Sequence, residues 1–489
     1  MNDRKNIRKE KSLAANVAYN MLSQFVALVV PLVTAPYIAR VFNADLIGSY
    51  SYALANSSYF VLFECLGFPL YGQIKVAACR DDKEKVSKLF AEIMLAKLAL
   101  TMVSLVIYMF IIGVPNESIQ YKLCLVMAIN ILANGLDVTW FLNGFEEFKI
   151  IAIRSIVVRI VNIVGILFFI KREEQILLYA IIMQGATFAS YLAGYPIVRK
   201  HISKIQWKKI NVLQHVKPAG IYFVPGLVNT IFSSTDKTML GIFSNNYEVG
   251  IYEQANKLSN ICMTAISAIG NVILPRASYL YNKQDYKEKA NELVYKSFNI
   301  VLMISIPVTL GMHAIAEEFI PIFFGTGYDG SIGILELLCY NVLFTSAANL
   351  LGQQCLVARQ KQKEYNISII VSAAMNVILN YLLIVYVKSV GAAIASVLAS
   401  IASFWMIVCF SKKEILIRKL FAMTWKYLGA AVVMYLLIKI QSNIYYGTFG
   451  GIGLRVMSGG TVYFIILACL KEEFTWGVIR NLLKKRNDE

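Results

Sequence analysis

The sequence predicts an all-α membrane protein with about fourteen transmembrane helices, and three observations support this fold class. Hydrophobic residues make up 57% of the chain. Charged residues make up only 16%, whereas soluble globular domains carry about 25%. Fourteen segments approach the ~20 mostly apolar residues that cross a bilayer as a helix. A soluble enzyme could not hide so much apolar surface from water, and a disordered chain would hold far fewer apolar residues, so both classes are excluded.

The predicted spans form two groups of six and a final pair. The first span follows a basic N-terminus and is too long for the apolar region of a cleaved signal peptide, so we expect it to remain as a helix. The spans lie near 13–40, 46–72, 89–113, 120–143, 150–170, 175–198, 218–243, 249–275, 293–317, 332–358, 366–387, 391–410, 427–440 and 453–470.

Basic residues between the spans predict the side of the membrane that each loop occupies. Of the 47 Lys and Arg residues, 34 fall in the termini and in alternate loops, and 3 fall in the other loops. Cytoplasmic loops carry such an excess, so we expect both termini in the cytoplasm and an even number of helices. The net charge of +17 is spread between apolar segments, which indicates topology rather than nucleic-acid binding.

Short motifs recur in the same order, between 202 and 214 residues apart. The pairs are 81–85 with 285–289, Gly48-x-Tyr50-x-x-Ala53 with Gly250-x-Tyr252-x-x-Ala255, Pro69 with Pro275, Lys149 with Lys363, and Asn162 with Asn376. Spans one to six therefore match spans seven to twelve, and both halves start from the same side of the membrane because six is even. We expect two parallel lobes, 1–212 and 213–410, with a site between them, followed by two accessory helices and a tail in 411–489.

Five basic residues inside the predicted spans indicate a polar, cationic cavity. A charge at a lipid-facing helix centre costs about 2.5–3.5 kcal/mol on insertion scales. Five such charges would cost about 15 kcal/mol, as much as the stability of a whole domain, so we expect them to face a wet interior. These residues are Arg40, Arg154, Arg159, Lys237 and Lys257. Basic residues nearer the span ends, Lys122, Lys439 and Arg455, are expected to snorkel to the interface.

The predicted eighth span carries a polar stripe at three- and four-residue steps, which lies on one helix face. It includes Glu253, Asn256, Lys257 and Asn260, of which Glu253 and Lys257 are four residues apart and can pair. Asp236 lies beside a basic residue on the seventh span. Asp236 and Glu253 either neutralise the neighbouring lysines or couple transport to an ion, and the sequence leaves both roles open. Polar stripes also join helices to one another in membranes. For each uncharged residue of the stripe, such helix packing is the alternative to a role in the cavity.

The sequence contains no motif of an ATP-driven pump or of a hydrolase. A Walker A motif is absent, as are H-E-x-x-H and G-x-S-x-G. The eight cysteines form no C-x-x-C pair and lie mostly in apolar segments, where we expect them to pack as small residues. We therefore predict that the chain is not an enzyme and holds neither a metal nor a bound cofactor.

Two stretches carry a family resemblance. The first comprises residues 36–42 (PYIARVF) and 48–53 (GSYSYA). The second comprises 236–241 (DKTMLG), 249–252 (VGIY) and 255–258 (ANKL), and ends with 274–276 (LPR). Together they resemble the polysaccharide transporters of the multidrug/oligosaccharidyl-lipid/polysaccharide exporter superfamily, and within it the Wzx-type flippases. The resemblance extends over nearly the whole chain, including the plan of six, six and two helices.

The resemblance implies a MATE-like fold that moves undecaprenyl-pyrophosphate-linked oligosaccharides across the bacterial cytoplasmic membrane by alternating access. It implies membrane lipids, a polysaccharide polymerase and the chain-length machinery as partners, and coupling to H⁺, Na⁺ or the membrane potential is left open. Arg40, Asp236, Lys237 and Lys257 match charged positions of the family-like stretches. Arg and Lys suit a diphosphate, and the polyprenyl tail is expected to stay in lipid, against the accessory helices.

Three alternatives differ in class. A cation-coupled multidrug exporter of the same superfamily would bind organic cations through acidic groups, which the excess of basic residues in the predicted cavity disfavours. A peptidoglycan lipid II flippase would share the substrate chemistry and stays open. A membrane enzyme such as a repeat-unit polymerase would be expected to carry a sizeable outer loop with catalytic residues, whereas the predicted outer loops are short.

Overall fold

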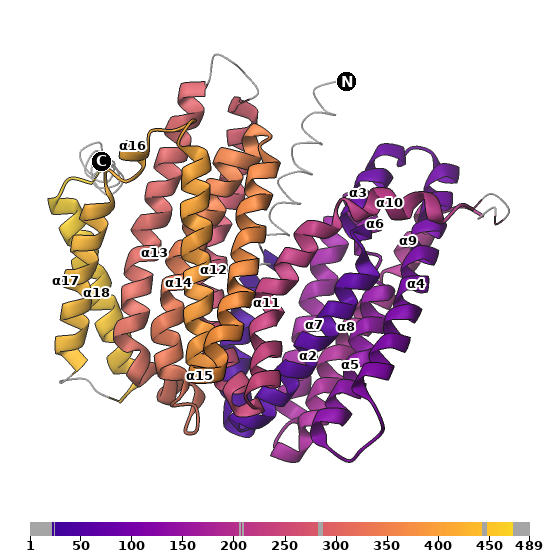
Figure 1. Ribbon diagram of the computed structural model, residues 1–489, viewed down its shortest axis with the longest axis horizontal. Helices are drawn as coiled ribbons and strands as arrows, with labels where there is room; N and C mark the ends of the chain where they lie inside the picture. Colours follow the sequence, from indigo (N-terminus) through magenta and orange to yellow (C-terminus); the bar gives the residue numbers. More distant parts are fainter. Residues whose placement is uncertain are drawn as a thin grey trace, which may run out of the picture. The chain divides into compact units, whose positions relative to one another are not determined.

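The chain is α-helical in the computed structural model, which describes residues 22–23, 25–204, 207, 210–281, 287–442 and 447–472. No strand occurs among these residues, so the predicted all-α class is confirmed. Two compact units make up the chain, Met1–Gly250 and Ile251–Glu489. In Figure 1 the first unit is coloured from indigo to magenta and the second continues to yellow.

The first unit is built around α2. This helix packs against α4, α5 and α11, while α5 packs against α8, and α8 packs against α7. The helices of the unit are Phe25–Val41, α2 (Ala44–Cys65), α3 (Phe68–Cys79), α4 (Lys83–Ile112), α5 (Ile119–Gly135), α6 (Thr139–Gly144), α7 (Phe148–Phe169), α8 (Ile176–Leu192), α9 (Tyr195–His201), α10 (Val216–Gly220) and α11 (Phe223–Phe243), with short turns at Glu173–Gln175 and Leu213–His215.

The second unit is built around α13 and α14. Helix α13 packs against α14, α17 and α18, and α14 packs against α15. A buried core containing Phe298, Val342 and Phe404 joins these helices. The helices are α12 (Asn246–Tyr281), which begins in the first unit, α13 (Lys287–Phe324), α14 (Ser331–Leu351), α15 (Gln362–Ser411), α16 (Ile417–Leu420), α17 (Thr424–Ser442) and α18 (Phe449–Cys469), with turns at Gly352–Leu356 and Val357–Arg359.

Side-chain caps determine where several helices begin. Asp82 precedes α4 and accepts hydrogen bonds from the backbone N–H groups of Glu84 and Lys85, both at 3.1 Å. Asn43 and Ser118 cap α2 and α5 in the same way. Such caps satisfy N–H groups that have no acceptor inside the helix. Hydrogen bonds from the backbone and the side chain of Lys85 also lower the pKa of Asp82.

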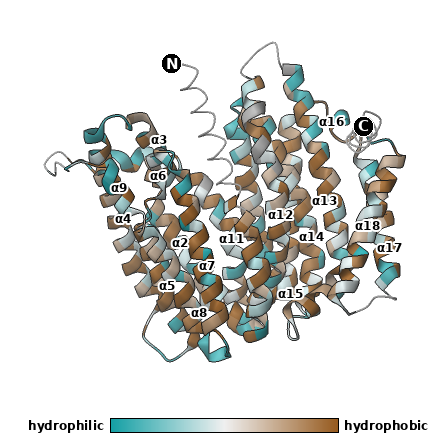
Figure 2. Cartoon of the chain, turned by 180° about the vertical axis from the view of Figure 1, so that it is seen from behind, coloured by the Kyte–Doolittle hydropathy of each residue, from teal (hydrophilic) through white to brown (hydrophobic). Residues whose placement is uncertain are grey.

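Ten helices among the described residues are long and apolar enough to cross a membrane, which confirms a multi-pass membrane protein. Helix α15 covers the eleventh and twelfth predicted spans, with non-helical backbone at Val387 and Lys388 between them. Helix Phe25–Val41 is shorter than these ten candidate spans, and neither α11 nor α12 is one of the ten. The predicted count of fourteen transmembrane helices therefore stays a prediction. The start of the first predicted span, 13–21, and the tail from 473 lie outside the described residues. Figure 2 shows hydrophobic residues along α4 and α5 and hydrophilic residues around α9.

The compact units end at a different residue from the predicted lobes. Helix α11 belongs to the first unit because it packs against α2. Thr238 donates a hydrogen bond to the side-chain oxygen of Asn56 at 3.1 Å, and Tyr59 donates one to Thr235 at 3.2 Å. The predicted boundaries follow the sequence repeat, whereas the units follow packing, so the division into 1–212, 213–410 and 411–489 stays a prediction.

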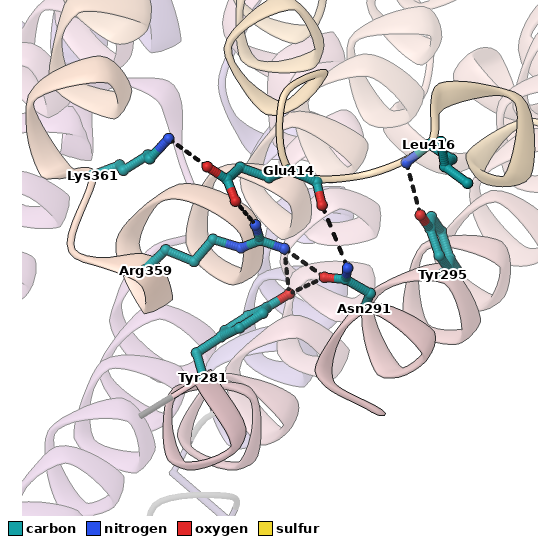
Figure 3. A network of polar contacts seen from close by, with 7 residues as sticks. All are labelled: Tyr281, Asn291, Tyr295, Arg359, Lys361, Glu414 and Leu416. Atoms are coloured by element: carbon teal, nitrogen blue, oxygen red, sulfur yellow. Dashed lines mark hydrogen bonds and ion pairs between the residues drawn. The ribbon is translucent and has the colours of Figure 1, made fainter. Parts of the chain in front are cut away.

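One polar cluster joins the predicted cytoplasmic ends of helices in the second unit (Figure 3). Arg359 pairs with Glu414, and its guanidinium lies 4.3 Å from the centre of the Tyr281 ring. Lys361 donates to the same carboxylate at 2.7 Å, and Asn291 donates to the backbone oxygen of Glu414 at 3.4 Å. The cluster therefore connects α12, α13 and both ends of α15 through a single acidic residue.

The first unit contains a contact that corresponds to the Lys361–Glu414 pair of the second unit. Here the acidic residue lies before the helices and the basic residue lies after them. The Glu147 carboxylate lies 3.5 Å from His201 at the end of α9, whereas Lys361 binds Glu414 after α15 in the second unit. Glu147 and Lys361 are 214 residues apart, the offset at which Lys149 recurs. In the first unit the loop before the fifth predicted span thus contacts the segment after the sixth. In the second unit the loop before the eleventh contacts the segment after the twelfth, and this correspondence supports the internal repeat.

Arg455 is a buried structural residue rather than a snorkelling one. Its side chain in α18 is 0% exposed and forms two hydrogen bonds with Glu318 of α13, one of them 2.8 Å long. The expectation that Arg455 reaches the interface is wrong because Glu318 offers a bidentate partner inside the protein. Lys439, in contrast, stays about one-third exposed, 3.9 Å from Glu317. The buried pair joins α18 to α13 within the second unit.

We predict that Arg455→Met lowers the free energy of unfolding by about 3–5 kcal/mol, because Glu318 would stay buried without its partner. The double variant Arg455→Met/Glu318→Leu should recover much of this loss. Thermal unfolding of the purified protein in detergent would measure both effects.

The matched control for this prediction is Lys122→Met. Lys122 pairs with Glu117, whose side chain is 95% exposed, and such surface pairs contribute about 0–1 kcal/mol. Equal destabilisation by Lys122→Met and Arg455→Met would contradict the role given to the buried pair.

Gly48 and Gly250, which correspond in the repeat, permit a close backbone contact. A Cβ atom on Gly48 would lie 1.7 Å from the carbonyl oxygen of Asn246, and one on Gly250 would lie 1.9 Å from that of Ala44. Both distances are far shorter than a van der Waals contact, so a larger residue could enter only by separating the segments. The start of α2 and the start of α12 therefore meet within the first unit because both positions are glycine.

We predict that Gly48→Ala and Gly250→Ala each destabilise the protein by about 1–3 kcal/mol or more, because overpacking forces the backbone to move. Gly429→Ala in α17 is the control, since a Cβ there meets nothing within 4 Å. Ala favours a helix over Gly by about 1 kcal/mol, so Gly429→Ala should be neutral or stabilising. Thermal unfolding would compare the three, and wild-type stability of Gly48→Ala would contradict the contact.

Candidate functional site

Three helices of the first unit line an open polar cavity of about 550 Å³. Its walls come from Phe25–Val41, α7 and α8, with one residue from α6. The polar residues that line it are Thr34, Thr139, Arg154, Ser155, Arg159, Asn162, Tyr179, Thr187, Ser190 and Tyr191. Two of the five basic residues predicted from the sequence, Arg154 and Arg159, therefore share one cavity.

A single face of α7 supplies the largest share of the lining. Its lining positions 151, 154, 155, 158, 159, 162 and 166 follow steps of three and four residues, the spacing of one helix face. The opposite face carries Ile153, Ile160 and Val164, which are about half exposed. The helix thus directs its guanidinium and amide groups inward and its branched apolar side chains away from the cavity.

Arg154 is held at the cavity wall by groups from three segments. Its guanidinium donates to Thr139, lies 3.7 Å from the Asp137 carboxylate, and lies 5.4 Å from the centre of the Tyr191 ring. Asp137 is itself oriented, because it accepts a hydrogen bond from the backbone N–H of Thr139 at 2.9 Å. The Arg154 side chain is only 10% exposed, and its Nη1 makes no hydrogen bond within the described part of the chain. This nitrogen is itself buried beside Gly194, where a Cβ atom would lie 2.8 Å from it.

Arg159 and Asn162 lie one and two turns further along α7. Arg159 donates to the backbone oxygen of Ser23 at 2.8 Å, so it connects α7 to the start of the first described helix. Asn162 is 8% exposed, and its side-chain oxygen is buried without a hydrogen bond among the described residues. A buried polar atom left unpaired costs about 1–3 kcal/mol.

Lys97 of α4 supports this wall from outside the cavity. Its ammonium group donates to the backbone oxygens of Asn134 and Asp137 at 3.0 and 2.9 Å, and the residue is 1% exposed. Glu64 of α2 is fully buried near Lys97, and neither of its carboxylate oxygens makes a hydrogen bond within the described ranges. Lys97 therefore fixes the segment that presents Asp137 to Arg154.

The sequence interpretation gave no role to Glu64, Lys97 or Asp137. The sequence did contain a signal, because Glu64 and Lys97 carry opposite charges inside the second and third predicted spans. Charges within spans are rare and tend to pair with one another. Their partners are far apart in sequence, so spacing along the chain does not reveal them.

The chemistry of the cavity favours an anionic ligand rich in hydroxyl groups. None of the residues that line it is acidic. Guanidinium groups bind phosphate oxygens through two parallel hydrogen bonds, and hydroxyl and amide side chains can both donate to and accept from sugar hydroxyls. An organic cation would meet two positive charges and no opposing one on this lining.

The other predicted residues of the first unit lie away from this cavity. Arg40 is exposed at the end of Phe25–Val41, Asp236 is buried in α11, and Lys237 is half-buried beside it. None of the three lines the cavity. Their role in binding or in coupling to an ion stays a prediction.

The predicted residues of the eighth span all lie on α12, in the second unit. Lys257 is 3.8 Å from Glu253 and donates to the side chain of Gln254 at 3.4 Å, so the predicted pairing of Glu253 with Lys257 is confirmed. Glu253, Asn256 and Lys257 are half-buried, and Asn260 is exposed. The cavity expected between the lobes stays a prediction. No group of three or more metal-ligating side chains occurs within the described ranges.

Comparisons with known proteins bear on this arrangement. The family described as "Polysaccharide biosynthesis protein" matches residues 13–281. The "Putative O-antigen transporter" of Escherichia coli (strain K12) is 24% identical over 386 residues, which cover 78% of this chain and 92% of that protein. The "Probable low-salt glycan biosynthesis flippase Agl15" of Haloferax volcanii is 26% identical over 168 residues, 34% of this chain and 35% of that protein.

A solved structure shares the fold. The lipid II flippase MurJ in its inward closed conformation superimposes with a TM-score of 0.76 at 14% identity, over 94% of this chain and 99% of that one. The resemblance drawn from the sequence motifs is therefore confirmed at the level of family and fold.

We predict that Lys97→Met lowers the free energy of unfolding by about 1–3 kcal/mol, because two buried backbone oxygens lose their donor. Lys83→Met is the matched control, since Lys83 is exposed in the first turn of the same helix. Thermal unfolding in detergent would compare the two variants. If they unfold at the same temperature, Lys97 does not support segment 134–137.

Proposed function

The chain belongs to the polysaccharide biosynthesis protein family, and from this premise we propose that it is a flippase for lipid-linked glycans. The proposed substrates are undecaprenyl-pyrophosphate-linked oligosaccharide repeat units of an O-antigen, capsule or exopolysaccharide. They would be moved from the inner to the outer leaflet of the bacterial cytoplasmic membrane. The names of the Escherichia coli and Haloferax volcanii relatives support a glycan substrate.

The observation that carries the proposal is the cavity lined by Arg154 and Arg159 without an acidic residue. A diphosphate head carries at least two negative charges, which the two guanidinium groups would bind. Asn162 and the hydroxyl groups of the lining would bind sugars. The same lining argues against the drug-exporter alternative, which would need acidic groups facing organic cations.

The cavity would lower the main barrier to translocation. Charged groups are expensive in hydrocarbon, and even one on a helix costs about 2.5–3.5 kcal/mol on insertion scales. Guanidinium groups that replace the hydration of the phosphates would remove much of that cost, while the tail stays in lipid. No bond is made or broken in this process, so we propose a transporter rather than an enzyme.

The remaining parts of the mechanism follow from the predicted topology. Alternating access of two parallel lobes would expose the site first to the cytoplasm and then to the outside. Both termini would lie in the cytoplasm, where basic loops concentrate. Arg40, Lys237 and Lys257 would contact the head group along its path. Asp236 and Glu253 would balance those charges or couple transport to H⁺, Na⁺ or the membrane potential. A polysaccharide polymerase and the chain-length machinery would act on the product.

We predict that Arg154→Gln and Arg159→Gln each slow translocation roughly ten- to a hundredfold, because each removes charge-assisted hydrogen bonds of about 1.5–3 kcal/mol. Substitution by Lys at either position should slow translocation less than substitution by Gln, since Lys keeps the charge but not the bidentate geometry. Lys237→Gln and Lys257→Gln should also slow translocation. Proteoliposomes that contain a fluorescent undecaprenyl-diphosphate oligosaccharide would report the rate.

Arg172→Gln is the control, because Arg172 is exposed in the segment after α7, and it should translocate at the wild-type rate. Membrane insertion should be normal in every variant. Wild-type rates in all the glutamine variants would refute the cationic site. Efflux of a cationic dye without sugar translocation would assign the chain to the drug exporters, and complementation of a strain lacking its lipid II flippase would change the assigned substrate.

A further inference from the structure

A second hollow, of about 400 Å³, lies between α7 and α8. One wall is formed by branched side chains of α7, including Val157 and Val161, and the other by small side chains of α8, Ala186, Ala189 and Ala193. The space exists because the alanines are too short to fill the gap that the branched residues leave. Arg154 and Ser190 are the polar members of this lining. We refer to this hollow as the α7–α8 groove.

The groove adjoins the polar cavity. Arg154, Val158 and Ser190 line both hollows, so the two meet where α7 and α8 approach each other. Arg154 is nine-tenths buried at this junction, and its Nη1 makes no hydrogen bond within the described ranges. A cationic donor thus lies between a compartment rich in hydroxyl groups and one lined by hydrocarbon.

The groove runs in the direction that a lipid of the inner leaflet would take. Arg154 is six residues into α7, about 9 Å from its predicted cytoplasmic end at 1.5 Å per residue. The groove includes Ile150 and Ile153 on the predicted cytoplasmic side of Arg154. On the other side it continues past Val157 to Val161, toward the predicted bilayer centre. Val157 and Val161 are 51% and 49% exposed, so this wall is open to the surrounding hydrocarbon.

We propose that the α7–α8 groove holds the polyprenyl tail of the lipid-linked substrate while Arg154 binds its diphosphate. This inference rests on the proposed function and adds the route by which the substrate reaches the cavity from the inner leaflet. A hollow of 400 Å³ holds on the order of a dozen methylene-sized groups at roughly 30 Å³ each. The groove therefore fits the tail segment next to the diphosphate, and the rest of the tail remains in the bilayer.

The groove would orient the substrate rather than bind it tightly. Lipid tails are as apolar as the groove, so moving a tail from the bilayer into it gains little hydrophobic free energy. The affinity would come from Arg154 and the polar cavity, and the groove would let the head group enter sideways without pulling the tail through protein. Blocking the groove should therefore hinder loading and spare the binding of a head group that has no tail.

The experiment uses the full-length protein in proteoliposomes and an undecaprenyl-diphosphate oligosaccharide with a photoreactive group in the isoprene units nearest the diphosphate. We expect the probe to label peptides from α7 and α8. Ala189→Phe and Ala186→Phe, which fill the groove, should abolish this labelling and slow translocation. Binding of a water-soluble sugar diphosphate should match the wild type. Ile160→Phe is the control, because Ile160 is an exposed residue of α7 outside the groove, and it should behave as the wild type.

Three results would overturn the role proposed for the groove. Labelling confined to α17 and α18 would place the tail on the accessory helices, and equal displacement of the probe by phosphatidylglycerol would mean that any lipid fills the hollow. Wild-type translocation by Ala189→Phe would also reject it while leaving the proposed function intact. Absence of translocation by the wild-type protein would instead reject the proposed function, and the labelling pattern would still decide where the tail lies.

Discussion

The central constraint on this protein is that guanidinium groups lie within helices that cross hydrocarbon, where an unpaired charge is expensive. The chain meets this constraint in two different ways. Arg455 forms a bidentate, fully buried pair with Glu318, which suits a permanent joint between helices. Arg154 lies 3.7 Å from Asp137 and keeps one nitrogen without a hydrogen bond in the described part of the chain. Arg455 is 0% exposed and pairs with a carboxylate on another helix, whereas Arg154 also lines a cavity that a ligand could occupy.

Support for Arg154 extends through several layers of the first unit. Asp137 orients the guanidinium, Lys97 holds the backbone of Asp137, and Glu64 lies beside Lys97. The series ends at Glu64, whose two carboxylate oxygens make no hydrogen bond in the described part of the chain. Comparable polar contacts occur at the predicted cytoplasmic ends of both units, where Glu414 joins four segments in the second unit (Figure 3). Polar groups thus organise the loops as well as the cavity.

The cavity and the α7–α8 groove together match an amphiphile. One compartment offers positive charge and hydroxyl groups, the other offers hydrocarbon, and Arg154 lies where they meet. A lipid-linked glycan has the same division, with sugars on one side of a diphosphate and an isoprenoid on the other. This correspondence links the cavity chemistry to the proposed substrate class without invoking the identity of any particular sugar.

Composition and spacing by themselves determined the helical membrane fold, because a bilayer requires every backbone group to be paired within its own segment or a closed sheet. They also indicated Arg154 and Arg159, since a charge inside a span signals a polar interior. Only the tertiary structure decided which partner each charge takes. Arg455 meets Glu318 across 137 residues, and Lys97 meets Asp137 across 40. Local periodicity describes the face of one helix, and pairs between distant helices arise from packing that no single segment encodes.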